Sequence, residues 1–276
     1  MASRFHHPSK PLPIETYALP LPAVPQAAQG LRIAHISDLH VRAARCPKPV
    51  RQLLETAPTL DADLVCLTGD YMDDPGDEDR ALGVLSELAD AIPARAQFFG
   101  VFGNHDSPAL VKRARSIDRI RWLDAEAQPL DTLGITIAGA GFPDDMPRTA
   151  LALRALEQTS KPSFTILLAH YPTEIVPAAA LGIPLVLSGH THGGQVRISP
   201  KLAPHTSSDL PSHLASGVLK LGATRCCVSR GVGDGFAPIR INCPPQLPIY
   251  TLERMAPDTP DTPDQPAPEL CAERRW

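Results

Sequence analysis

The chain has 276 residues, of which 43% are hydrophobic and 20% charged, so it can bury a sizeable core in one large or two small domains. Its formal net charge of −4 argues against a dedicated DNA- or RNA-binding protein, which usually shows a basic face. The lack of an apolar run of about 18 residues, and of a signal-peptide core near the start, predicts a cytoplasmic location, with peripheral association at the inner membrane as the alternative.

The two ends of the chain differ in composition from the body between them. Residues 1–29 are rich in proline, which argues against a long helix, although "ETYALPLP" fits an edge strand, where proline is tolerated. In residues 256–276 proline repeats with Asp and Thr and little apolar content, and we expect this tail to be disordered. Residues 30–255 are therefore predicted to form one domain.

The body alternates short apolar runs with helix-like stretches. Six runs have the length of buried strands, at 31–37, 62–68, 96–102, 134–140, 163–169 and 183–188. Shorter strands are predicted at 194–199, 225–229 and 248–252, and helices at 47–57, 77–91, 107–117 and 147–159. Strands that alternate with helices predict an α/β fold, and the later run of strands predicts a second sheet.

Polar side chains stand just after five of these predicted strands, and five of the ten histidines are among them. In open α/β sheets the ligand-binding crevice lies outside the carboxyl ends of the strands. We therefore expect these side chains to share one site. They are Asp38, His40, Asp70, Asp73, Asn104, His105, Asp106, His170, His190 and His192.

Seven of these residues form a donor set of three oxygens and four imidazoles, namely Asp38, Asp70, Asn104, His40, His170, His190 and His192. The set is too large for one tetrahedral zinc ion and matches two metals that share a carboxylate. Mixed imidazole and carboxylate donors suit Mn, Zn or Fe better than Ca, and Mg is a further candidate. Any one of these motifs alone would more often indicate a turn or a satisfied polar group, but their order and placement agree.

The motifs closely resemble those of the calcineurin-like metallophosphoesterase family, in the same order along the chain. The family's D-x-H, G-D-x-x-D, G-N-H-D/E, lone His and G-H-x-H stand here as Asp38-Leu39-His40, Gly69 to Asp73, Gly103 to Asp106, His170, and Gly189 to His192. The resemblance implies a four-layer αββα sandwich of two mixed sheets flanked by helices. It also implies two divalent metal ions bridged by Asp70, one held by Asp38, His40 and His192 and the other by Asn104, His170 and His190.

The same resemblance implies that His105 is a catalytic residue and not a ligand. A metal-activated hydroxide would attack phosphorus while His105 assists the leaving group. We expect Asp106 to orient the His105 imidazole, and Gly103 to keep the turn free of side-chain clash. Asp73 either completes the G-D-x-x-D motif or caps the acidic loop, and both interpretations stay open.

The segments "LSGHTHGGQV" and "VSRGVG" resemble a subgroup with bacterial membrane-associated phosphodiesterases, including pyrophosphatases of UDP-diacylglucosamine. This implies a small phosphorylated or nucleotide-linked substrate, with a lipid-linked one as a narrower option. Arg230 is a candidate phosphate clamp, with an ordinary ion pair as the equal alternative, and Gly193 is a candidate for close backbone approach to the phosphate. We predict hydrolysis of a phosphodiester or pyrophosphate bond; a phosphomonoesterase and a non-catalytic scaffold are the alternatives.

Overall fold

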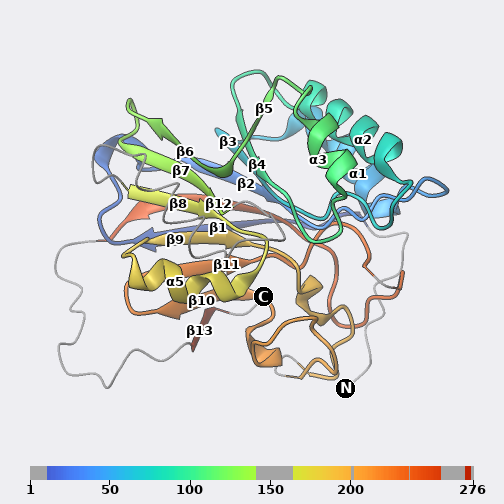
Figure 1. Cartoon of the computed structure of the whole chain (residues 1–276). Helices are drawn as coiled ribbons and strands as arrows, with labels where there is room; N and C mark the ends of the chain where they lie inside the picture. The colour runs from blue at the N-terminus through green and yellow to red at the C-terminus, as the bar shows by residue number, and fades with distance from the viewer. Residues whose placement is uncertain (1–10, 141–163, 200–201, 236, 256–270, 275–276) are drawn as a thin grey trace.

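The computed structural model describes residues 11–140, 164–199, 202–235, 237–255 and 271–274, which form two packed β-sheets with helices outside them (Figure 1). In spatial order, the first sheet holds β1 (Ile14–Leu21), β12 (Leu247–Arg254), β2 (Arg32–Ile36), β3 (Leu64–Thr68), β4 (Gln97–Val101) and β5 (Ile120–Trp122). The second holds β13 (Cys271–Arg274), β10 (Gly217–Leu221), β11 (Thr224–Val228), β9 (Leu185–Ser188), β8 (Phe164–Leu168), β7 (Ile135–Ala140) and β6 (Asp124–Leu130).

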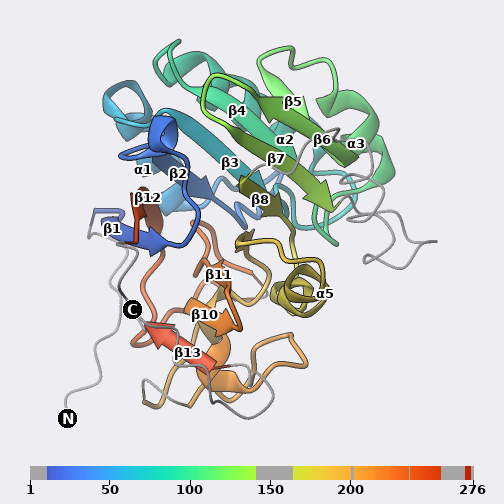
Figure 2. The same cartoon turned by 90° about the vertical axis from the view of Figure 1, so that its left-hand side faces the viewer.

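Helices cover the outer face of each sheet, which confirms the predicted αββα sandwich. Figures 1 and 2 show α1 (Lys48–Thr56), α2 (Glu78–Ala91) and α3 (Pro108–Ala114) outside the first sheet and α5 (Ile175–Ala180) outside the second. Short 3-10 helices lie in the connections, namely η1 (Gln26–Ala28), η2 (Ala57–Thr59), η3 (Pro172–Glu174), η4 (His192–Gly194) and η5 (Ser212–Leu214). The Ser107 side chain accepts the Leu110 N–H and so caps α3, in which Pro108 takes the first position.

The strand β3 shows why the buried runs are continuously apolar. Leu64 and Cys66 pack into the core between the sheets, whereas Val65 and Leu67 pack into the core beneath α1–α3. Successive side chains of a strand point to opposite faces, so a strand covered on both faces needs apolar residues at every position. The core between the sheets thus ties the two halves of the chain together.

Parallel pairing gives the central strands of each sheet a common direction. In the first sheet β2, β3 and β4 are parallel neighbours, and in the second sheet β8, β9 and β11 are. The loops that follow the strands of one parallel set therefore leave from the same edge of the sheet. This topology gathers the polar residues at the strand ends.

The structure corrects several of the predicted element boundaries. "ETYALPLP" does form an edge strand, β1, which pairs in parallel with β12, so the folded body begins inside the proline-rich segment. Residues 271–274 depart from the expected disorder, because they form β13, which pairs with β10 and stands at the edge of the second sheet. The segment 194–199 is not a ladder strand; it forms part of η4 and isolated bridges, such as Val196 with Ile241.

Other differences have a physical reason in the local sequence. The strands β5, β6 and β10 and the helix α5 were not predicted, because they are short or carry polar and proline residues that weaken the apolar signal. The predicted helix at 147–159 lies outside the described residues. Within the described ranges, no helix has the length and hydrophobicity needed to cross a bilayer.

The core between the sheets yields a prediction about stability. Leu187 in β9 is fully buried in it, so Leu187→Ala should lower the free energy of unfolding by about 2–5 kcal/mol, the usual cost of such a cavity. Leu202→Ala, at a side chain that is 49% exposed, should change it by less than about 0.5 kcal/mol. Urea denaturation of both variants measures the difference, and equal effects would contradict the described packing.

Candidate metal centre

The predicted ligands from both sheets meet at one edge of the sandwich. Asp38, Asp70 and Asn104 follow β2, β3 and β4 of the first sheet, whereas His170 and His190 follow β8 and β9 of the second. The His190 N–H donates to Asp38 Oδ1 at 2.9 Å and so joins the two sets directly. The tertiary structure thus collects residues that are about 150 positions apart in the chain.

Asp38, His40 and His192 form the first group of candidate ligands, and all three are buried. The Nε2 atoms of His40 and His192 are 3.0 Å apart, and His192 Nε2 lies 3.6 Å from Asp38 Oδ1. The three ligand atoms lie within 4.8 Å of one another. This spacing allows one ion to contact all three.

Asp70, His170 and His190 form the second group, which Asn104 joins. His170 Nε2 lies 3.1 Å from Asp70 Oδ2, 3.2 Å from His190 Nδ1 and 3.1 Å from Asn104 Oδ1. Four donor atoms from four separate loops therefore converge on one point. These groups have the same members as the two ligand sets implied by the family resemblance.

Asp70 lies between the groups. Its Oδ2 is 3.5 Å from His40 Nε2 and 3.1 Å from His170 Nε2, so one carboxylate oxygen faces an imidazole of each group. Burial would raise the pKa of Asp70, but the nearby His170 and His40 imidazoles outweigh burial and hold that pKa below its usual range. The carboxylate stays ionised, as a ligand shared by two cations requires.

A buried oxygen without a partner supports the metal interpretation. Within the described part of the chain, Asp38 Oδ2 is buried and accepts no hydrogen bond. A buried carboxylate oxygen in this state is costly unless a cation compensates it. The carboxylate, amide and imidazole donors of both groups fit divalent Mn, Zn or Fe. The residues present therefore fit divalent metal ions.

Three of the histidines are oriented by oxygen atoms behind them. His40 Nδ1 lies 2.8 Å from Asp73 Oδ1, His170 Nδ1 lies 2.7 Å from the Thr68 carbonyl oxygen, and His190 Nε2 lies 2.6 Å from the Ser207 carbonyl oxygen. Each of these nitrogens is the donor toward its oxygen. In the neutral imidazole the opposite nitrogen then carries the lone pair and faces the ligand group, which is the tautomer that binds a metal.

The backbone at five ligands adopts the left-handed conformation. The φ angles are +55° at Asp38, +44° at His40, +58° at Asp70, +69° at His190 and +49° at His192. Non-glycine residues seldom adopt this region, and each costs on the order of 1 kcal/mol or more. Strain concentrated at these residues indicates that the loops are shaped to aim the side chains.

Gly103 and Gly69 allow two of these loops to touch. A Cβ at Gly103 would stand 2.2 Å from Asp70 Oδ1, and one at Gly69 would stand 2.5 Å from the Gly103 nitrogen. A side chain at Gly103 would displace Asp70, and one at Gly69 would push the loop that carries Gly103 away. The expected need for glycine at position 103 therefore has a steric cause.

His105 is exposed and lies beside the first group. Its ring meets the His40 ring edge-on at 4.8 Å, and its main-chain N–H donates to Asp70 Oδ1 at 2.9 Å. The ring nitrogen Nδ1 lies 2.7 Å from the Asp73 carbonyl oxygen and donates to it. That bond leaves Nε2 as the nitrogen that can exchange a proton with a substrate.

The expectation that Asp106 orients this imidazole is wrong. Its carboxylate accepts the backbone N–H groups of Asp70, Tyr71 and Gly103 at 2.8–2.9 Å, and the Asp73 carbonyl orients the ring instead. Asp106 points back into the protein because three N–H groups converge there. It therefore ties the two loops together and acts as a positioning residue.

The two residues predicted to bind substrate, Arg230 and Gly193, have contacts within the protein that account for them. The Arg230 side chain is buried, pairs with Glu15 at 2.8 Å and donates to the Pro244 carbonyl, so the ion-pair interpretation holds for this residue. Gly193 is buried, and a Cβ there would stand 2.8 Å from Cys243 Sγ. Close packing explains this glycine without a substrate.

Asp73 supports the candidate ligand His40, a role that its sequence motif left open. Asp73 bonds His40 and also pairs with Arg42 at 2.6 Å, so it is more than a loop cap, as the second Asp of G-D-x-x-D could have indicated. His40, Asp73 and His105 form a third group that could hold a metal. The bonds of Asp73 to Arg42 and of His105 to a carbonyl favour orientation over ligation.

Arg240 had no motif to indicate it. The side chain of Arg240 is buried. Its Nη2 atom lies 3.4 Å from His192 Nδ1 and donates to the Gly233 carbonyl oxygen at 2.5 Å. Burial, His40 and Arg240 together lower the pKa of His192 well below its ordinary value. His192 therefore stays neutral, the form in which an imidazole binds a metal.

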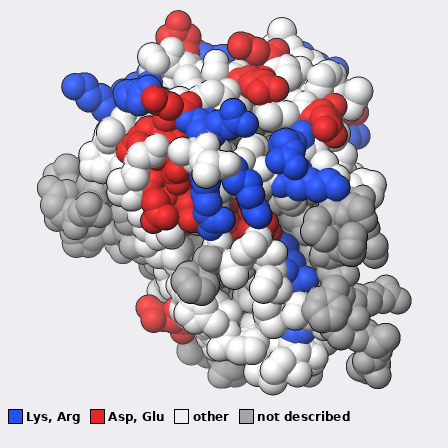
Figure 3. Space-filling model, turned by 90° about the vertical axis from the view of Figure 1, so that its right-hand side faces the viewer, with Lys and Arg blue, Asp and Glu red and all other residues white. Residues whose placement is uncertain are grey.

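The face on the right-hand side of Figure 1 carries charges of both signs. Figure 3 shows Lys and Arg beside Asp and Glu over its upper half and mostly uncharged residues below. The described residues of this face therefore form no continuous basic surface for a polyanion such as nucleic acid.

The orientation of His40 leads to a prediction about metal affinity. Asp73→Asn removes the carboxylate that fixes the His40 tautomer, so metal affinity should fall about 10- to 100-fold. Calorimetric titration of metal-free protein with Mn²⁺ or Zn²⁺ measures this change. Asp74→Asn changes an exposed neighbouring carboxylate and should leave the affinity unaltered. Unchanged binding by Asp73→Asn would contradict its role behind His40.

Metal binding should also release protons. Burial alone would lower the pKa of His170, but the Asp70 carboxylate outweighs burial and raises it to about 9 in the metal-free protein. A metal needs the neutral imidazole, so affinity should rise with pH up to about 9 and fall as His170 becomes protonated below it. Titrations at pH 7 in buffers of different ionisation enthalpy count the released protons, and an enthalpy independent of buffer would contradict the prediction.

Known proteins resemble this chain over most of its length. The family model of the calcineurin-like phosphoesterases matches residues 31–194, more than half of the chain. The chain is 26% identical over 235 residues to the metallophosphoesterase YkuE of Bacillus subtilis (strain 168), covering 83% of this chain and 82% of YkuE. It is 29% identical over 262 residues to YpbG of the same organism, covering 91% of this chain and 92% of YpbG.

Among solved structures, the chain is similar to TT1561 of Thermus thermophilus, with a TM-score of 0.48, 16% identity, and coverage of 73% of this chain and 90% of TT1561. The segment matched by the family model contains every candidate ligand, from Asp38 to His192. This match and the Asp and His groups support a metal-dependent phosphoesterase. The chain belongs to the calcineurin-like phosphoesterase family.

Proposed function

We propose that the protein hydrolyses a phosphodiester or pyrophosphate bond with two divalent metal ions. The observation that carries this proposal is the position of Asp70, whose Oδ2 faces an imidazole of each ligand group. Asp38, His40 and His192 would hold one ion, and Asn104, His170 and His190 the other. When bound, such ions supply Lewis-acid activation of water and neutralise charge on the phosphoryl oxygens.

His105 is the proposed general acid. Its Nδ1 is engaged by the Asp73 carbonyl, so a proton carried on Nε2 is the one that it can donate to the leaving oxygen. Its backbone is held by Asp70, and its exposed ring stands next to His40. The bond to Asp73 thus fixes the direction in which His105 delivers the proton.

The state of nearby arginines favours a diester over a monoester. Among the described residues, four arginines contact the loops that carry the ligands, and each is already engaged: Arg42 by Asp73, Arg197 by the Gly193 carbonyl and the Ser216 hydroxyl, Arg230 by Glu15, and Arg240 by Asp234 and backbone carbonyls. A phosphomonoester carries one more negative charge than a diester and gains most from a free cation. These arginines do not offer one, so the monoanionic diester is the better match.

Sequence-based expectations about the rest of the substrate stay predictions. The substrate could carry a nucleotide-linked or a lipid-linked group, and the contacts of the metal centre favour neither. The cytoplasmic location, with peripheral association at the inner membrane as the alternative, also stays a prediction. The choice between diester and pyrophosphate likewise depends on the group attached to the phosphate.

Hydrolysis of bis-p-nitrophenyl phosphate by metal-stripped protein, titrated with Mn²⁺, Zn²⁺, Fe²⁺ and Mg²⁺, tests the proposal. We expect activity that metal restores and that exceeds activity on p-nitrophenyl phosphate. His105→Ala should keep its metal and lose about 10²–10⁴ in kcat, the usual contribution of a general acid. His213→Ala, in η5, is the matched control and should retain full activity.

The alternative outcomes each point elsewhere. A higher rate on the monoester would replace the diesterase by a phosphomonoesterase. Unchanged turnover of His105→Ala would remove this residue from the mechanism. Inactivity on both esters, in protein with full metal content by elemental analysis, would favour a non-catalytic scaffold.

A further inference from the structure

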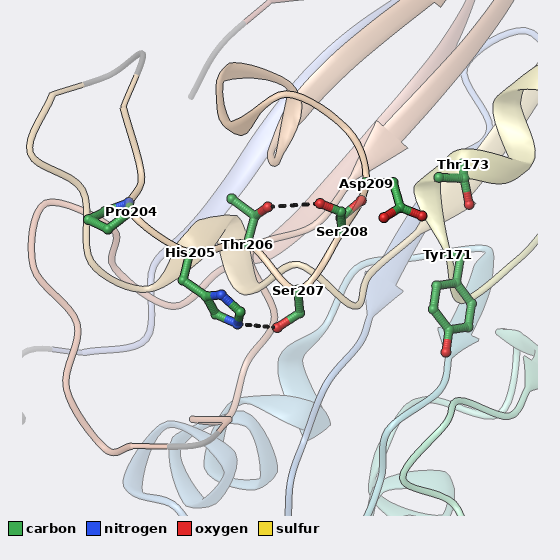
Figure 4. Close-up of a pocket in the computed structure, with 8 residues that line it drawn as sticks. All are labelled: Tyr171, Thr173, Pro204, His205, Thr206, Ser207, Ser208 and Asp209. Atoms are coloured by element: carbon green, nitrogen blue, oxygen red, sulfur yellow. Dashed lines mark hydrogen bonds between the residues drawn. The ribbon is translucent and has the colours of Figure 1, made fainter.

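A pocket of about 530 Å³ lies beside the second ligand group and holds none of the candidate ligands in its wall. It is lined by Tyr171, Thr173 and residues 204–209 (Figure 4). This volume is within the range of pockets that bind small molecules. The function proposed above does not use these residues.

The pocket is physically joined to the second ligand group. The Ser207 carbonyl oxygen in its wall accepts from His190 Nε2 at 2.6 Å, and the Tyr171 ring lies 4.2 Å from the His190 ring and 5.2 Å from the His170 ring. The pocket therefore begins where the second group ends. If a phosphoryl group is bound at the second ligand group, a substituent on that phosphoryl group lies next to this pocket.

The wall of the pocket is rich in hydroxyl groups and poor in positive charge. Its side chains are five hydroxyl groups, one proline, one imidazole and one carboxylate, and no Lys or Arg is among them: Tyr171, Thr173, Thr206, Ser207, Ser208, Pro204, His205 and Asp209. A second phosphate would meet the Asp209 carboxylate without a compensating cation. Neutral groups with several O–H donors suit this wall better.

Internal bonds hold the loop in shape while Asp209 faces the hollow. The Ser207 hydroxyl lies 3.0 Å from His205 Nε2, and the Thr206 hydroxyl donates to the Ser208 carbonyl at 3.4 Å. Figure 4 shows the Asp209 carboxylate between Ser208 and Thr173, on the Tyr171 side of the loop. A ligand hydroxyl can reach this acceptor without breaking a bond of the loop.

We infer that this pocket binds a hydroxyl-rich, sugar-like group esterified to the phosphate. The Tyr171 ring provides a flat wall next to the metal centre, and Asp209 accepts hydrogen bonds from ligand hydroxyls. This inference rests on the proposed phosphodiesterase function and narrows its substrate to phosphate esters of a polyol or sugar. Among the described residues of the wall there is no Lys or Arg, which separates this class from substrates that carry a further phosphate at this position.

Two p-nitrophenyl phosphodiesters test the inference. The second ester group is glucose, linked through its 6-hydroxyl, in one compound and cyclohexylmethyl in the other. They share the leaving group and a six-membered ring and differ in the hydroxyls. We expect the metal-loaded protein to prefer the glucose ester about tenfold in kcat/KM, the effect of one hydrogen bond to a charged group. Asp209→Asn and Thr173→Val should each lower this ratio through KM, and Asp131→Asn, at an exposed carboxylate outside the pocket wall, should leave it unchanged.

The outcomes separate the two proposals. A wild-type ratio near one, or a ratio that Asp209→Asn leaves intact, would overturn the sugar pocket while hydrolysis itself upholds the phosphodiesterase. If neither ester is hydrolysed, saturation-transfer NMR with glucose 6-phosphate and cyclohexylmethyl phosphate reads binding alone. A preference for the sugar that Asp209→Asn abolishes would support the pocket even then, and equal binding would contradict it.

Discussion

The close contact between Gly189 and Asp38 is the constraint on which the site depends. A Cβ on Gly189 would stand 1.9 Å from Ser37 Oγ and 2.3 Å from Asp38 Oδ2, so the loop after β9 lies directly on the loop after β2. The next residue, His190, donates its N–H to Asp38. Because these loops belong to different sheets, both ligand groups form only when the sandwich is packed. A shift of one sheet would separate Asp38 from His192 and Asp70 from His170.

The packed core and the strained loops are parts of one arrangement. Five candidate ligands have left-handed backbones, an unfavourable state that the surrounding hydrogen bonds must maintain. Asp106 supplies three of those bonds and fixes the loops after β3 and β4. The oxygens of Asp73, Thr68 and Ser207 then set the histidine tautomers. These bonds hold the ligands in the arrangement that a metal needs, which limits the reorganisation that metal binding requires.

Charge balance connects this geometry to the proposed chemistry. The arginines around the site are paired with groups of the protein itself, and the neighbouring pocket is lined mainly by hydroxyl groups and a carboxylate. Bound cations would then supply the main positive charge that a phosphate meets, with His105 as the proposed proton donor. The proposed substrate, a singly charged phosphate with a neutral substituent, fits this balance of charge. The His190–Ser207 bond means that the loop shaping the pocket also orients a candidate ligand.

The sequence by itself determined the class of fold and the identity of the candidate ligands. Apolar runs at 31–37 and 62–68 marked strands, and Asp, Asn and His at their ends marked a site, because parallel strands bring their carboxyl ends to a common edge. Short or polar elements such as β6 and α5 gave too weak a pattern to find.

Only the tertiary structure decided which atoms behind the ligands matter. A carboxylate in a motif can point in either direction, so Asp106 was assigned to His105 although it binds backbone N–H groups. Arg230 faces Glu15 in the edge strand β1, a partner 215 positions away that no local pattern reveals. The oxygens that orient His170 and His190 are main-chain carbonyls, which every residue carries. Sequence names the side chains that can do chemistry, whereas long-range packing decides where each one points.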